Sequence, residues 1–173
     1  MSIAYFFIKN TPEKLLAYLK ETKNSDEQEK IVNRLIELKA EKELWNILET
    51  KNHQALISEA LLEVNHDKPD MLMRLYNIVD EQFRKPIVER LVELKAEKEL
   101  WNIIKTKTHQ AIISEALFKA NHDKPDMLMR LYNIVDEQFR KPIVERLVEL
   151  KAEKELWNIL ETKNHQGIIS EAL

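Results

Sequence analysis

The sequence contains no cysteine and only one glycine, Gly167. Without cysteine there is neither a disulfide nor a thiolate metal site, which is typical of a reducing compartment, and we expect a cytoplasmic protein. A phosphate-cradling loop, a dinucleotide fingerprint and a nucleophile elbow each need glycines that the chain lacks. These absences exclude the commonest nucleotide-binding and hydrolase motifs.

Excess charge and long apolar runs are also missing. The 27 basic and 30 acidic residues leave a net charge of -3, too small to attract a polyanion over long range, so nucleic acid is disfavoured. The apolar start, Ile3 to Ile8, is too short to cross a bilayer and lacks the features of a signal peptide. We expect residues 1–10 to form a flap over the first helices; the alternative is a short anchor on a membrane surface.

What the chain does contain is 44% hydrophobic and 33% charged residues, with Leu, Lys, Glu and Ala abundant. These are strong helix formers, and with 5 prolines and one glycine there are few signals for strands or tight hairpins. The composition predicts an ordered all-α protein, with residues 1–173 forming a single domain.

The segment ELKAEKELWNI occurs at residues 37–47, 93–103 and 149–159, which gives a period of about 56 residues. Residues 65–103 and 121–159 agree at every position, including positions such as Lys68 and Gln82 that we expect on the surface. Packing restrains the core and leaves the surface free to vary. The agreement therefore indicates a recent duplication, or a designed protein in which one module was multiplied.

Each long unit contains a fainter repeat, since LWNILETKNHQALISEALLEV from Leu44 resembles LYNIVDEQFRKPIVERLVEL from Leu75. This predicts two helical hairpins per unit and roughly six in the chain, the last one incomplete. The first kind of helix has one apolar stripe, and the second kind has a wider stripe, typical of a helix covered from two sides. The two stripes consist of Leu72, Leu75, Tyr76 and Val79, and of Ile87, Val88, Leu91, Val92 and Leu94.

Polar residues and prolines predict where these helices begin and end. Asp67 or Asp70 offers a favourable charge at one helix start, and Pro86 suits the first turn of the next. Asparagine tolerates left-handed backbone angles, so we expect helices to end at Asn52, Asn65 and Asn121.

From about Thr11 onward, the hairpin lengths and apolar spacing resemble those of the HEAT and armadillo class of α-solenoids. The resemblance implies a right-handed α-solenoid of stacked antiparallel helical hairpins, each covering the apolar side of the next. It also implies a scaffold that binds proteins or peptides along its surface, while some members bind nucleic acid. The Asp and Arg ladder that HEAT units often carry in their turns is not clearly present in this sequence.

Residues that carry chemistry elsewhere have plainer interpretations here. The serines of the ISEA segments lack a neighbouring base, so we expect polar surface residues rather than nucleophiles. Glu63 and His66 have the Glu-x-x-His spacing of di-iron bundles, but Lys119 replaces the glutamate in the next copy. The other recurring histidines precede glutamine at a hairpin turn, where capping or solvent exposure is expected. We predict no enzyme activity, no metal and no cofactor; the residues concerned are Ser58, Ser114, Ser170, His122, His53, His109 and His165.

Aromatic residues recur at one repeat position, with tryptophan in one kind of hairpin and tyrosine in the other. Such a row can stack bases or grip a proline-rich peptide. A fixed repeat position suits identical contacts between repeats, so we expect these rings to fill the seams between hairpins. They are Trp45, Trp101 and Trp157, with Tyr76 and Tyr132.

Charged residues of the second kind of helix are the candidates for partner binding. They form Arg and Glu pairs three residues apart, which repetition would align in rows; the alternative is a solvated face that only maintains solubility. The pairs are Arg34 and Glu37, Arg90 and Glu93, and Arg146 and Glu149, with Glu59, Glu115 and Glu171 extending the acidic row. A nucleic-acid-binding solenoid would instead use a basic ridge of Arg84, Lys85, Arg140, Lys141, Lys68 and Lys124.

The last hairpin is unfinished, and its apolar residues Ile168, Ile169 and Leu173 lack the next repeat that would cover them. We therefore expect end-to-end self-association or membership of a longer array. Taken together, the sequence predicts a non-catalytic helical-repeat scaffold with an unknown protein or peptide partner and no membrane contact.

Overall fold

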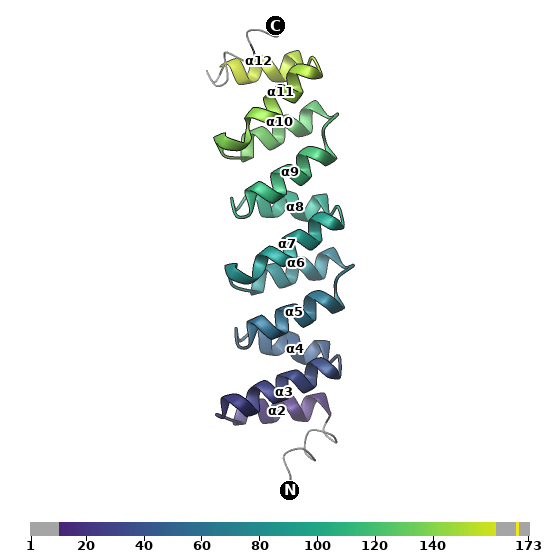
Figure 1. Cartoon of the computed structure of the whole chain (residues 1–173), viewed down its shortest axis with the longest axis vertical. Helices are drawn as coiled ribbons and strands as arrows, with labels where there is room; N and C mark the ends of the chain where they lie inside the picture. Colours follow the sequence, from purple (N-terminus) through teal and green to yellow (C-terminus); the bar gives the residue numbers. More distant parts are fainter. Residues whose placement is uncertain (1–10, 162–168, 170–173) are drawn as a thin grey trace. The chain divides into compact units, whose positions relative to one another are not determined.

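The computed structural model describes residues 11–161 and Ile169 (Figure 1). This part of the chain is all-α, with no strand among its residues. None of its helices is long and apolar enough to span a membrane. The predicted flap, residues 1–10, lies outside the described residues, as do Gly167, His165, Ser170, Glu171, Ile168 and Leu173.

The chain divides into two compact units, residues 1–90 and residues 91–173. The described helices of the first are α2 (Pro12–Glu21), α3 (Ser25–Glu37), α4 (Glu41–Leu48), α5 (Gln54–Val64) and α6 (Pro69–Ile78), then the short 3-10 helix η1 (Glu81–Phe83) and most of α7 (Arg84–Glu93). Helices α2 to α6 each pack against the next in sequence, and α2 and α3 also contact α4 and α5, respectively.

The second unit repeats this pattern with α8 (Glu97–Ile104), α9 (Gln110–Ala120), α10 (Pro125–Ile134), η2 (Glu137–Phe139), α11 (Lys141–Glu149) and α12 (Glu153–Glu161). Its helices again pack in chain order, and α10 also contacts α12 (Figure 1). This sequential packing supports a helical repeat, as the sequence predicted.

The apolar stripe predicted for the first kind of helix is confirmed, because Leu72, Leu75, Tyr76 and Val79 of the α6 segment are all buried. Fully burying one such aliphatic side chain contributes roughly 1.5–3 kcal/mol, so the buried stripe contributes substantially to the stability of its unit. The wider stripe predicted for α7 is only partly buried. Its Ile87, Val88 and Leu91 are buried, but Val92 and Leu94 remain half-exposed.

The helices α5 and α9 end at Asn65 and Asn121, as the sequence predicted, but the backbone angles of these asparagines differ from the prediction. Asp70 lies in the first turn of α6. The prediction of left-handed asparagines is wrong: Asn65 and Asn121 have φ of -110° and -126°, and Asn52 does not have positive φ either. The side-chain amides of Asn65 and Asn121 are buried and donate to the carbonyls of Leu61 and Leu117 at 3.0 Å.

Positive φ angles fall instead on lysine and histidine in the turns between helices. Lys51 has φ of 59° and His53 of 53°, and Lys107 and His109 repeat these values at 60° and 56°. Left-handed angles cost energy in any residue with a Cβ, so tertiary contacts must hold these turns. One such contact is the ion pair between Lys51 and Asp80.

Candidate functional site

The first unit contains an apolar pocket of about 350 Å³ between α5 and the start of α7. One wall is a single face of α5, formed by Ala55, Ser58, Glu59 and Leu62. These residues follow the spacing of zero, three, four and seven that places side chains on one side of a helix. The other wall comes from η1 and α7 and consists of Gln82, Phe83, Pro86 and Ile87.

The second unit contains the same pocket, with a volume of about 310 Å³. Each first-unit lining residue has its counterpart 56 positions later, and Leu131 of α10 joins the lining. The lining residues are Ala111, Ser114, Glu115, Phe118, Leu131, Gln138, Phe139, Pro142 and Ile143. Only one shared position changes residue type, since Phe118 replaces Leu62.

The serines of the pocket walls are hydrogen-bonded within their own helices. Ser58 and Ser114, expected on the surface, are buried, and their hydroxyls donate to the carbonyls of Ala55 and Ala111 at 3.2 and 3.3 Å. A hydroxyl held by the backbone of its own helix is not activated by a base. The serines therefore shape the wall, and the exposed Ala55 leaves the mouth open because its side chain is a single methyl group.

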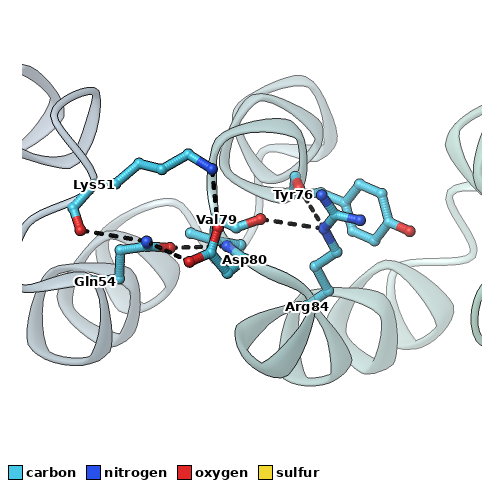
Figure 2. A network of polar contacts seen from close by, with 6 residues as sticks. All are labelled: Lys51, Gln54, Tyr76, Val79, Asp80 and Arg84. Carbon is cyan, nitrogen blue, oxygen red and sulfur yellow. Dashed lines mark hydrogen bonds and ion pairs between the residues drawn. The ribbon is translucent and has the colours of Figure 1, made fainter.

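A polar network at one end of the pocket fixes η1 against α5 (Figure 2). Gln54 is buried, and its carbonyl oxygen accepts a hydrogen bond from the backbone N–H of Asp80 at 2.8 Å. Its Nε2 donates to the Asp80 carboxylate at 2.9 Å, and Lys51 Nζ lies 3.0 Å from the other carboxylate oxygen. We name Lys51, Gln54 and Asp80 the loop clamp. It ties the turn before α5 to the segment that supplies Gln82 and Phe83.

Arg84 holds the other side of the same segment. Its guanidinium lies 4.8 Å from the centre of the Tyr76 ring, and its Nε donates to the carbonyls of Tyr76 and Val79 at 3.1 and 3.2 Å (Figure 2). Stacking and charge-assisted hydrogen bonds together fix the end of α6 to the start of α7. The pocket wall is therefore held by residues on both sides of η1.

The second unit repeats the clamp in part, because the buried Nε2 of Gln110 has no hydrogen-bond partner among the residues that the structure describes, whereas Nε2 of Gln54 donates to the Asp80 carboxylate. Lys107 Nζ lies 2.8 Å from the Asp136 carboxylate, and Gln110 accepts from the Asp136 backbone N–H at 2.9 Å. The hydrogen bond from Lys51, then that from Gln54, holds the pKa of Asp80 below its ordinary value. Lys107 is likewise the largest cause of the lowered pKa of Asp136. Both carboxylates are therefore stabilised in their charged form.

Two of the predicted Arg and Glu pairs form ion pairs in the structure. Arg34 Nη1 lies 2.6 Å from the Glu37 carboxylate, and Arg146 Nη1 lies 2.7 Å from that of Glu149. Each pair also lies within its own helix, as the spacing of three requires.

The equivalent arginines also make a contact that the sequence did not reveal. Arg90 Nε donates to the carbonyl of His66 at 2.6 Å, and Arg146 Nε donates to that of His122 at 2.7 Å. These bonds fasten α7 and α11 to the turns that follow α5 and α9. The side chains thus have a structural role, and partner binding by them, including Glu93, stays a prediction.

The tryptophans show how the environment of one repeat position varies along the chain. Trp45 and Trp101 are 4% and 5% exposed, and the guanidinium groups of Arg74 and Arg130 each lie 4.3 Å from the ring centre. Trp157, at the same repeat position, is 57% exposed. The exposure of this indole does not test the predicted end-to-end self-association, which stays a prediction.

The basic residues proposed for a nucleic-acid ridge mostly have partners within the chain. Lys85 and Lys141 lie 3.8 Å from the carboxylates of Glu89 and Glu145. Lys68 donates to the side-chain oxygen of Asn65 at 3.3 Å, and Lys124 donates to that of Asn121 at 3.4 Å. Arg140, like Arg84, stacks on a tyrosine, with its guanidinium 4.9 Å from the Tyr132 ring centre.

In the Glu-x-x-His motif the histidine ring contacts the backbone at the end of the preceding helix, since His66 Nδ1 lies 2.9 Å from the carbonyl oxygen of Glu63. Across residues 11–161 and Ile169, no group of three or more His, Cys, Asp or Glu residues is placed to hold a metal ion. His53 and His109 occupy the position before the first turn of α5 and α9 without a side-chain capping hydrogen bond.

Comparison of the chain with protein-family models, curated proteins and solved structures finds no match.

Proposed function

We propose that this chain is a non-catalytic helical-repeat scaffold that binds a protein or peptide through the two equivalent pockets. The observation that carries the proposal is that the same apolar hollow forms twice, from residues at the same repeat positions. Volumes of about 310 and 350 Å³ lie at the small end of the range for ligand sites, and each suits one or two inserted side chains.

The chemistry of the lining supports binding over catalysis. Five of the eight residues that line the first pocket are apolar, and its serine is hydrogen-bonded to its own helix. Apolar walls with few polar groups recognise side chains by shape and burial, and the polar groups fix their orientation. A partner segment that presents one or two apolar side chains would suit either pocket.

The proposed architecture is a right-handed, HEAT-like α-solenoid of antiparallel hairpins. It is supported by the contacts of each helix with its sequence neighbours within each unit. Small-angle scattering tests it, because a solenoid of this length gives an elongated distance distribution and a closed globule gives a symmetric one. Codon usage across the three copies of the gene would separate natural duplication from design.

Selection from a displayed peptide library tests the binding function. Ala55→Trp and Ala111→Trp together would fill both pocket mouths, and Asn77→Trp with Asn133→Trp adds the same rings at exposed positions outside the pockets. We expect peptides selected on the wild-type chain to lose binding to the first double variant and keep it to the second. Equal binding to both variants, at unchanged helicity, would refute the pockets as the binding site.

A further inference from the structure

The two pockets differ in charge although their walls are almost the same. Residues 44–64 and 100–120 differ at seven positions, and two of these reverse a charge: Glu49 becomes Lys105, and Glu63 becomes Lys119. The second reversal lies four residues after the pocket glutamate of each unit, which is one helical turn away on the same side. It therefore decides the electrostatic character of the pocket rim.

In the second unit the rim glutamate already has a cation. Lys119 Nζ lies 2.6 Å from the Glu115 carboxylate. The hydrogen bond and the charge of Lys119 lower the pKa of Glu115, so the carboxylate is charged and compensated at neutral pH. A basic group arriving from a partner would have to compete with this lysine.

In the first unit the same glutamate has no such cation. Glu63 stands where Lys119 stands in the other unit, and no ion pair to Glu59 forms among the residues that the structure describes. Glu29 adds a further carboxylate in the adjoining cleft, which shares Ala55, Gln82 and Phe83 with the pocket. The lysine of that cleft, Lys51, is paired with Asp80. The first pocket thus combines an apolar floor with an uncompensated acidic rim.

We propose that the first pocket binds a peptide segment that inserts an apolar side chain between α5 and α7 and places an adjacent arginine or lysine against Glu59. The proposal rests on the proposed function and adds to it the chemistry of the partner. Arginine suits the site best, because its planar guanidinium can donate two parallel hydrogen bonds to one carboxylate. The second pocket binds the apolar side chain without selecting the basic one.

The experiment compares a charged and a neutral peptide at both pockets of one molecule. The probes are acetyl-Gly-Leu-Arg-Gly-amide and the same peptide with citrulline, which keeps the shape of arginine and removes its charge. Methyl NMR of 13C-labelled alanine reports each pocket separately, through Ala55 in the first unit and Ala111 in the second. Because affinities are compared as the arginine-to-citrulline ratio at each pocket, the Leu62 to Phe118 difference cancels.

We expect arginine to bind about two- to fivefold more tightly than citrulline at the Ala55 pocket, the effect of one exposed ion pair. The ratio should be close to one at the Ala111 pocket, and the preference at Ala55 should shrink in 0.5 M salt. Glu63→Lys should remove the preference in the first unit, and Lys119→Glu should create it in the second. Both changes lie on exposed positions, so the fold is expected to be unaffected.

Two different failures can be told apart. Shifts at both methyls with equal ratios, or ratios unchanged by the two charge swaps, would overturn the charge selection while leaving pocket binding intact. No saturable shift at either methyl with either peptide would overturn both this proposal and pocket binding of such peptides. If library-selected peptides then still bind the wild type and lose binding to the Ala55→Trp and Ala111→Trp double variant, the pockets bind a partner of another chemistry.

Discussion

The side chain of Gln54 forms hydrogen bonds with both the backbone and the side chain of Asp80. It accepts from the Asp80 N–H at 2.8 Å and donates to the Asp80 carboxylate at 2.9 Å. The two residues lie 26 positions apart, one at the start of α5 and the other at the start of η1 (Figure 2). This paired contact joins the start of α5 to the residue before η1, the segment that supplies Gln82 and Phe83 to one wall of the first pocket. Its removal is therefore the most direct test of how the pocket is built.

Gln54→Ala should destabilise the first unit by about 0.5–1.5 kcal/mol, the contribution of a typical hydrogen bond, because the backbone N–H of Asp80 would lose its acceptor. Urea unfolding followed by circular dichroism measures the effect. Gln110→Ala is the matched change in the second unit and should cost a similar amount, since Gln110 also accepts from Asp136. A cost near zero at both positions would show that water replaces the amide and that the clamp contributes little.

The loop clamp should also make stability depend on pH at the acid end. The folded-state pKa of Asp80 lies below its ordinary value of 3.8, so the unfolded chain takes up the proton first. The stabilisation is therefore complete above pH 3.8 and is lost as the pH falls from there through the lowered folded-state pKa.

Thermal unfolding of the wild type and of Asp80→Asn between neutral pH and pH 2.5 checks this expectation. The wild type should lose more stability over the acid range than the variant, and Asp136→Asn should behave in the same way because its pKa is also lowered. Parallel pH profiles for wild type and both variants would contradict it.

Tryptophan truncation should have unequal effects at equivalent positions. Trp45→Ala removes a ring that is 4% exposed and should cost about 3–5 kcal/mol, as do other large-to-small changes in a core. Trp157→Ala removes a ring that is 57% exposed and should cost far less. Acrylamide quenching of single-tryptophan variants gives an independent check, because Trp157 should be quenched most strongly. Equal quenching of Trp45 and Trp157 would show that the exposed indole is covered in solution.

The Glu49 to Lys105 difference changes the neighbour of a stacked arginine. In the first unit Arg74 lies over Trp45 and 3.0 Å from the Glu49 carboxylate. In the second unit Arg130 makes the same stack on Trp101, but the glutamate position is occupied by a lysine.

Lys105→Glu should therefore stabilise the second unit by about 0.2–1 kcal/mol at low salt, and Glu49→Lys should destabilise the first by a similar amount. Denaturant titrations at 20 mM and 500 mM salt measure both changes. High salt should reduce them, since exposed ion pairs are screened. An effect that does not depend on salt would point to packing of the side chains rather than their charge.

The sequence by itself determined that this protein is all-α and that helices recur at a fixed period. Those properties follow from local propensity and apolar spacing, which each helix carries in its own residues. The buried stripe of Leu72, Leu75 and Tyr76 and the favourable charge of Asp70 could both be read in this way.

The tertiary structure decided the features that depend on residues far apart in the chain. Sequence placed Ser58 on the surface and left-handed angles on Asn65, but burial and a hydrogen bond to Leu61 reversed both expectations. The pocket likewise needs α5 and η1 side by side, and the charge of its rim depends on which side chain reaches Glu59. Spacing within one helix can show which residues share a face, but only packing shows what that face meets.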